Sequence, residues 1–422
     1  MIRLPFLLSS VYIAYVFPKL TGLLLSDSRL AEVYRYAQTS DRVTAMVGLC
    51  YFACLAGYYY VRPGGRFPSV PLDIPLLRYR RIRNISVFLV IISYIGVIGL
   101  AQEAGGLSQF FLDMDGYTLD WRGSEVYYLF ISRFIYVPIL LLFILYWHKK
   151  SNSILCLLIF ASMYPLANIF LLFRRSEILQ FGFITGFVLL MYYKIRPSRL
   201  YVISVVFVMM AAVVLFPEIR TSKFRGEALE EGFVGHRFSQ FINFEDNNEM
   251  AAAAYLVHRT SQTGQLEYGA IFVNALVNQF VPAGLVGNDL KQSLHVGGAD
   301  ADDFYFSEWN RSRYFYLAPM GFAQAYVQFG YLGCLIFAAL GTFVGKLEHW
   351  RLRSFSGEMM YVLMLGPIVL AVSNDIQAPV VRFATYCALF GFLALSGYLT
   401  SLKRTREGML FYSPAYLSRF SR

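Results

Sequence analysis

Residues 126–150 read VYYLFISRFIYVPILLLFILYWHKK. The stretch 126–147 is almost entirely apolar, and it is long enough for an α-helix to cross the roughly 30 Å hydrocarbon layer of a bilayer. His148, Lys149 and Lys150 then close it with basic side chains, which is typical of the cytoplasmic end of a span. This stretch therefore predicts a transmembrane helix that begins outside the cell membrane and ends inside it.

Similar runs recur along the chain and fix its class. Hydrophobic residues make up 57% and charged residues 15%, a composition that excludes an ordinary soluble domain of 422 residues. We predict an all-α, multi-pass transmembrane bundle of about ten spans with additional interfacial or re-entrant helices. The first run shows no small-residue cleavage site, so we expect it to stay as an uncleaved span. The predicted spans are 5–25, 43–61, 85–101, 126–147, 153–173, 178–193, 200–216, 318–345, 359–376 and 383–402.

The lysine and arginine bias predicts the orientation of these spans. The connection 62–84 holds six arginines and one acid, and the segments 194–199, 346–353 and the tail from Lys403 are also basic. All of them fall on one side if the N-terminus is inside, and the opposite side then receives 23 of the 27 acidic residues. Both termini are therefore expected in the cytoplasm. The net charge of +10 follows from this bias and from attraction to anionic lipids, so nucleic acid is not an expected partner.

A long polar segment interrupts the spans on the outer side. Residues 217–316 hold 13 of the 27 acidic residues and three of the five histidines. We divide the chain into an N-terminal bundle (1–216), a large outer loop that is the candidate catalytic region (217–317), a C-terminal bundle (318–402) and a cytoplasmic tail (403–422). The loop is expected to be structured, with a capped helix over 247–260 and an apolar helix over 268–281 that is too short to cross a membrane.

Basic residues on the outer side run against the charge bias and mark a candidate anion site. Arg174 and Arg175 follow the fifth predicted span, Glu177 could orient them, and Arg220 and Arg225 follow the seventh. An arginine fork stays charged and grips phosphate oxygens at two points, whereas the alternative is snorkelling to lipid headgroups. Two further arginines near outer helix ends, Arg133 and Arg382, are interpreted as packing or snorkelling residues.

Aromatic and titratable residues complete the candidate site in the loop. Trp309 and Tyr314 belong to a dense aromatic cluster that predicts either an interfacial belt or flat faces for sugar rings, beside Arg311 and Arg313. His236, which precedes Arg237, and His295 are the first two candidates for a general base. The segment Asp300-Ala301-Asp302-Asp303 is assigned to a solvated turn rather than a metal site, and no metal or cofactor is expected. All five cysteines fall in apolar spans and are expected to pack in the core.

From Leu266 onward the chain resembles the O-antigen polymerase (Wzy-type) family of lipid-linked oligosaccharide polymerases. The matching elements are Glu267-Tyr268-Gly269, a short amphipathic helix to Val281-Pro282, then Ala318-Pro319-Met320-Gly321 and the stretch 326–333, YVQFGYLG. Arg175 with Gly186 repeats a weaker arginine–glycine pattern of the family's outer loops. The chain departs from many relatives at Ala283, where they carry arginine, and at Gln324, where they carry glutamate.

The resemblance implies a reaction and its partners. The family transfers a growing glycan from undecaprenyl diphosphate to the terminal sugar of a new lipid-linked repeat unit, in O-antigen, capsule or exopolysaccharide synthesis. The expected location is the bacterial inner membrane with the large loop in the periplasm. Expected partners are undecaprenyl-diphosphate-linked oligosaccharides and membrane lipids, with a chain-length-regulating co-polymerase as a further candidate. The alternatives are an O-antigen ligase, a transporter or flippase of a lipid-linked saccharide, and a non-catalytic membrane scaffold.

Overall fold

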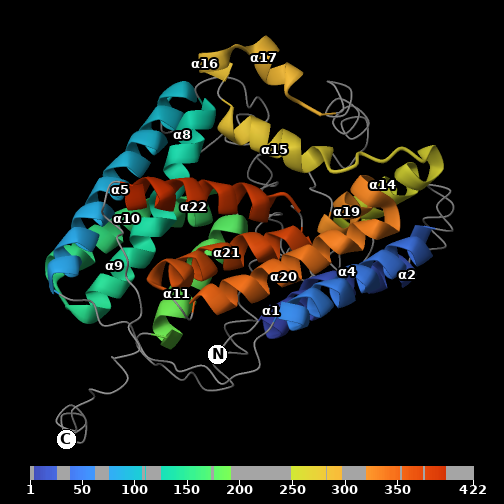
Figure 1. Cartoon of the computed structure of the whole chain (residues 1–422), viewed down its shortest axis with the longest axis horizontal. Coiled ribbons are helices and arrows are strands. Elements are labelled where there is room, and N and C mark those ends of the chain that lie inside the picture. Colours follow the sequence, from blue (N-terminus) through green and yellow to red (C-terminus); the bar gives the residue numbers. More distant parts are fainter. Residues whose placement is uncertain are drawn as a thin grey trace, which may run out of the picture.

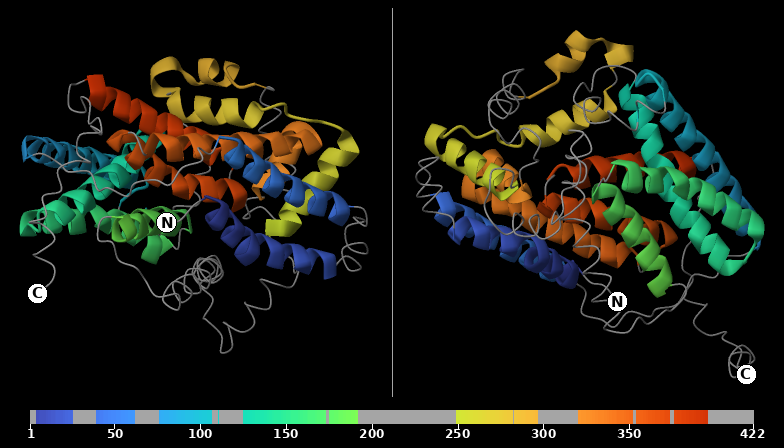
Figure 2. Two further views of the ribbon diagram at one scale, coloured as in Figure 1. Left: turned by 60° about the horizontal axis from the view of Figure 1, so that its bottom comes forward. Right: turned by 180° about the vertical axis from the view of Figure 1, so that it is seen from behind.

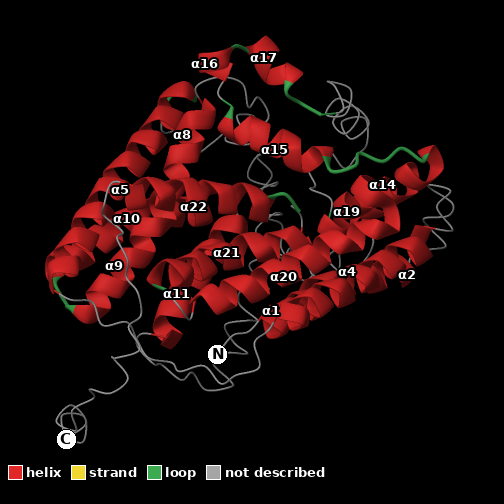
Figure 3. Cartoon of the chain, in the orientation of Figure 1, coloured by secondary structure: helices red, strands yellow, loops and turns green. Residues whose placement is uncertain are grey.

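The computed structural model describes residues 4–25, 39–61, 76–106, 110, 125–172, 175–191, 249–281, 283–296, 320–351, 354–373 and 376–395. In this part of the chain the protein is all-helical, with 91% helix and no β-strand (Figure 3). The predicted fold class is thereby confirmed at this level. The helices pack as a bundle, with the N-terminal and C-terminal segments side by side (Figures 1 and 2).

The N-terminal half contributes the outer helices of the bundle. They form six apolar segments, two of which contain a short non-α helix, η1 or η2. They are α1 (Leu4–Val11), η1 (Tyr12–Val16) and α2 (Phe17–Leu25); α4 (Thr39–Val61); α5 (Leu76–Glu103); α8 (Glu125–Ser132), η2 (Arg133–Ile135) and α9 (Tyr136–His148); α10 (Asn152–Leu172); and α11 (Arg175–Met191).

The segment predicted to be the outer loop and the C-terminal half supply the remaining described helices. The loop helices are α14 (Glu249–Thr263), α15 (Ala270–Phe280), α16 (Ala283–Val286) and α17 (Asn288–Ser293). The C-terminal helices are α19 (Gly321–Phe329), η3 (Gly330–Gly333), α20 (Cys334–Arg351), α21 (Phe355–Ser373) and α22 (Ala378–Leu395). The apolar loop helix expected over 268–281 is thus confirmed as an 11-residue helix.

Among the described residues, six helices are long and apolar enough to cross a membrane: Thr39–Val61, Tyr79–Glu103, Val126–His148, Asn152–Leu171, Gly321–Arg351 and Phe355–Ser373. The predicted spans 178–193 and 383–402 correspond to shorter apolar helices, Ser176–Leu189 and Ala378–Leu393. The first predicted span forms three short helices in series, and 200–216 lies outside the described residues. The count of about ten therefore remains a prediction.

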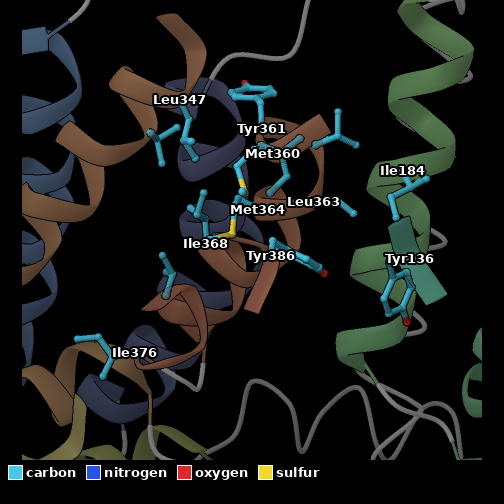
Figure 4. Close-up of a cluster of buried hydrophobic side chains, with 14 of the residues drawn as sticks. Tyr136, Ile184, Leu347, Met360, Tyr361, Leu363, Met364, Ile368, Ile376 and Tyr386 are labelled. Atoms are coloured by element: carbon cyan, nitrogen blue, oxygen red, sulfur yellow. The ribbon is translucent and has the colours of Figure 1, made fainter. Parts of the chain in front are cut away.

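Helix α21 forms the centre of the bundle. Its most apolar stretch is 89% buried within the protein, compared with 33–61% for the other five candidate spans, so α21 contacts protein on nearly all sides. Its buried side chains include Met360, Leu363, Met364 and Ile368, and Tyr386 of α22 belongs to the same cluster (Figure 4). In contrast, α5 and α10 leave large apolar side chains exposed along their lengths, as lipid-facing helices do. These include Phe88, Ile91, Ile95, Ile98, Ile159, Met163 and Phe170.

Glycines let α4 and α20 approach to backbone contact. A Cβ on Gly57 would overlap the carbonyl of Ala338, and one on Gly341 would overlap the carbonyl of Cys54. From Gly341 to Gly345 on α20, the neighbouring residue on α4 changes from Cys54 to Val61. Residue numbers therefore increase in the same direction along both helices, and the pair is parallel. Small residues at close crossings are typical of helix packing in membranes. The parallel pairing agrees with the predicted orientation, in which both helices begin outside.

The expectation that cysteines pack in the core holds for two of the five. Cys50 and Cys54 are buried on α4, Cys334 is half-buried, and Cys156 and Cys387 are exposed. Cys156 and Cys387 lie on helix faces turned away from the bundle. The hydropathy of the sequence does not distinguish such a face from one in the core, because both are apolar.

Candidate functional site

A polar cluster lies between four elements at the end of the bundle that the charge bias assigns to the outside. Arg133 belongs to η2, Glu177 to the first turn of α11, Gln279 to α15 and Arg382 to the first half of α22. Arg133 Nη1 donates to Gln279 Oε1 at 2.9 Å. Both guanidinium groups act electrostatically on Glu177, and all three charged groups act on Tyr386. We call Arg133, Glu177, Gln279, Arg382 and Tyr386 the arginine–carboxylate cluster.

Helix α15, which supplies Gln279 to the cluster, packs against α8 and α22 (Figure 1). The Arg133–Gln279 hydrogen bond fixes one side of this helix. Next to it, Phe280 packs edge-to-face on Phe130, with ring centroids 5.6 Å apart. One polar and one aromatic contact therefore hold the loop helix over the charged groups and reduce their exposure to water.

Three buried atoms of the cluster have unfilled hydrogen-bonding capacity. Arg382 Nη1, Gln279 Nε2 and Glu177 Oε2 each lack a hydrogen-bond partner within the part of the chain that the structure describes. Most buried polar groups in proteins are hydrogen-bonded, and an exception calls for an explanation. A site that receives a polar group from a substrate provides one.

The structure brings together the two segments that carry the family resemblance. Helix α19 breaks at Gly330, where φ is +60°, so the carbonyls of Val327 and Gln328 cannot bond to the next turn. They accept hydrogen bonds instead from the backbone N–H groups of Glu267 (3.1 Å) and Tyr268 (3.0 Å). The Gln328 side chain also accepts from Gly269 N–H at 2.9 Å and donates to the Glu267 carboxylate. The broken helix thus sets where α15 begins.

Gln324 is one of the two positions where the chain departs from the pattern of the family that it resembles, and it has a defined contact. Its Oε1 accepts a hydrogen bond from the backbone N–H of Ile376 at 2.9 Å, and the side chain is buried. Gln324 therefore ties α19 to the connection before α22.

Helix α14 is anchored to the first two helical segments of the chain, α1–α2 and α4. At its first residue, Glu249 forms a buried ion pair with Lys19 and accepts a hydrogen bond from Tyr15. Two turns on, His258 Nδ1 lies 3.0 Å from Thr39 Oγ1 at the start of α4. This loop helix is therefore part of the bundle. The cap expected at Asn247 or Asn248 lies outside the described residues.

His295, one of the two candidate bases, lies on another face of α15. Its Nε2 is 3.0 Å from Asn278 Oδ1, and the nearby Lys291 Nζ donates to the Asn278 carbonyl at 3.3 Å. Burial lowers the pKa of Lys291. Asn274, one turn before Asn278, binds the backbone of Val296 and holds this segment against α15. Gln279 is turned toward Arg133 instead, so the structure does not bring His295 together with the arginine–carboxylate cluster.

Most of the other predicted site residues fall outside the described part of the chain: His236, Arg174, Arg220, Arg225, Arg237, Arg311, Arg313, Trp309 and Tyr314. The same holds for Asp300, Asp302 and Asp303. Arg175 is the first residue of α11, and only its backbone is described. Within the described ranges, no group of three or more His, Cys, Asp or Glu could hold a metal ion.

Arg133 and Arg382 were interpreted from the sequence as packing or snorkelling residues. In the structure both act on Glu177 and Arg133 donates to Gln279, contacts that are compatible with packing and that add a charge interaction the sequence did not indicate. The available signal was an ionisable residue inside one predicted apolar segment and directly before two others, a pattern that makes such residues candidates for a functional site. Their convergence could not be predicted, because it depends on how η2, α11 and α22 pack.

Comparison with known proteins identified no matching family model, no curated relative and no solved structure.

Proposed function

We propose that this chain is a polymerase of lipid-linked oligosaccharide repeat units. It would transfer a growing glycan from undecaprenyl diphosphate to the terminal sugar hydroxyl of a new lipid-linked unit, at the outer face of a bacterial inner membrane. The arginine–carboxylate cluster is the observation that supports this most strongly. It combines two cations, a carboxylate and an amide from four elements that lie far apart in the sequence.

The reaction needs charge stabilisation where the diphosphate leaves. Preorganised cations in a site that excludes water are effective at this, because little screening or reorganisation opposes them. Arg174, Arg175, Arg220 and Arg225, which the sequence predicts on the outer side, are proposed to form the diphosphate site. Arg133 and Arg382 are proposed to add positive charge next to that site from within the arginine–carboxylate cluster. Arg237, Arg311, Arg313, Trp309 and Tyr314 are proposed to contact the sugars.

Two lipid-tethered substrates also need to be held together. Positioning of this kind supplies a large part of the rate, since it replaces an encounter in solution by a reaction within one complex. The anchored helix α14, the broken helix at Gly330 and the covering helix α15 give the outer loop a fixed frame for it. The base that deprotonates the acceptor hydroxyl is one of His236, His295 or a carboxylate.

Polysaccharide profiling of a deletion strain tests the proposal. Loss of the gene should collapse the ladder of long chains to single repeat units that remain attached, and complementation should restore it. Loss of all attached units would indicate a ligase instead, and loss of lipid-linked units from the outer face would indicate a transporter. An unchanged profile of every surface polysaccharide would contradict all three.

The arginine assignment is tested in the same strain. Arg175→Ala should abolish long chains at a normal protein level, and Arg175→Lys should lose much of the activity, because lysine keeps the charge but not the two-point fork. Full-length ladders from Arg175→Ala would contradict a role in binding diphosphate, and a matching loss of protein would indicate a packing role.

A further inference from the structure

The three unpartnered atoms of the arginine–carboxylate cluster have complementary needs. Arg382 Nη1 and Gln279 Nε2 are donors, whereas Glu177 Oε2 is an acceptor. A phosphate oxygen would satisfy the donors but meet the carboxylate as a second anion. A hydroxyl group has both capacities that these atoms need, because it accepts up to two hydrogen bonds and donates one. The chemistry of the cluster therefore favours a sugar hydroxyl over an anion at this position.

We propose that Glu177 is the base of the transfer and that Arg382 and Gln279 hold the acceptor hydroxyl against it. This inference rests on the proposed function. The hydroxyl proton passes to Glu177 Oε2, and the hydroxyl oxygen forms a bond to the anomeric carbon of the donor glycan. The bond from that carbon to the diphosphate oxygen breaks, and its electron pair leaves with undecaprenyl diphosphate.

The surroundings of Glu177 suit a base. Burial raises the pKa of Glu177, which makes the ionised carboxylate a stronger proton acceptor, and the charges of Arg382 and Arg133 oppose this shift by stabilising the ionised form. Arg133 is held by Gln279, so the same contact that places α15 also places the Gln279 amide. Arg133 of η2 therefore contributes both to the position of α15, through Gln279, and to the charge state of Glu177.

The two described histidines of the outer loop are placed differently. His258 Nδ1 is engaged by Thr39 at the start of α4, and His295 Nε2 is engaged by Asn278 on another face of α15. Glu177 is thus the one titratable acceptor, among the described outer residues named here, that has a buried free oxygen next to two cations.

The test uses the full chain purified from membranes and reconstituted with lipid-linked repeat units extracted from the deletion strain. Glu177→Gln keeps the shape of the side chain and removes the base, so the rate of polymer formation should fall by about 100-fold or more. The matched control is Glu103→Gln, the same change at an exposed acid at the outer end of α5, which should keep wild-type activity.

Two readouts separate a base from a structural carboxylate. The wild-type rate should rise with pH as the carboxylate ionises, whereas the residual rate of Glu177→Gln should not change over that range. Sodium formate should restore part of the activity of Glu177→Ala, because it supplies a carboxylate that the protein lacks, and it should not affect Glu177→Gln, whose amide fills the space.

The outcomes are distinguishable. Wild-type protein that makes no polymer from these units overturns both the proposed function and this inference. An active wild type with an equally active Glu177→Gln variant overturns the inference alone. The inference also fails if Glu177→Gln and Glu177→Ala lose activity only in proportion to folded protein, with no change of pH profile and no formate rescue.

Discussion

At the residue scale, the buried pair Lys19–Glu249 decides whether the outer loop stays attached to the bundle. The two side chains are only 7% and 4% exposed. Removing one partner leaves an uncompensated buried charge, which costs about 3–5 kcal/mol, whereas replacing both with neutral groups is far less costly. We expect Lys19→Met to lower thermal stability strongly and Lys19→Met/Glu249→Gln to recover much of the loss, as measured by thermal aggregation of the detergent-solubilised protein. Additive losses in the double variant would show that the pair is not coupled.

His258 gives the outer loop a defined sensitivity to acid. Burial, and to a smaller extent the charge of Arg42, lowers the pKa of His258. The unfolded chain therefore binds a proton at a pH, about 6.5, where the folded chain does not. Stability is present above that pH and is lost as the pH falls through the lowered folded value. His258→Gln should reduce the drop in melting temperature between pH 7 and pH 5, and an unchanged drop would contradict the assignment.

At the element scale, the contact between α4 and α20 depends on glycine rather than on hydrophobicity. A methyl group at Gly341 would overlap the backbone of Cys54, so Gly341→Ala forces the helices apart. We expect a loss of about 1–3 kcal/mol. Gly48→Ala is the matched control on α4, because a Cβ there meets nothing within 4 Å, and it should be neutral or slightly stabilising. Equal effects in thermal unfolding would contradict the close crossing.

The elements also show what a sequence pattern can and cannot predict. Hydropathy located the short apolar helix before Val281 to within two residues at each end, because the length of an apolar run is a local property. The predicted span 318–345 instead divides at Gly330 into α19 and α20. Hydropathy does not detect that break, which comes from one backbone conformation stabilised by Glu267 and Tyr268 across 60 residues.

The site was less predictable than the elements for the same reason. Glu177 could be named from its position among basic residues, but its partners in the structure come from η2 and α22. Each of those arginines, taken alone, resembles a snorkelling residue near a helix end. Only their packing around one carboxylate gives them a joint role.

At the scale of the whole molecule, the charge bias predicts an orientation that can be tested directly. Reporters fused after Lys150, Arg199 or Arg353 should be cytoplasmic, and a tag inserted near Gly298 should be accessible from outside. The parallel pairing of α4 and α20 requires both helices to begin on one side. A Gly298 tag that stays protected from external labelling in intact cells would place the outer loop in the cytoplasm and remove the proposed site from the glycan.

The central claim, that this chain joins lipid-linked glycan units, is tested most directly with purified components. The reconstituted protein is incubated with lipid-linked single repeat units from the deletion strain, and the glycan lengths and free undecaprenyl diphosphate are measured together. Polymerisation predicts a ladder of products, with one undecaprenyl diphosphate released for each new linkage. Single units that keep their length and their lipid, with no diphosphate released, would contradict the proposal.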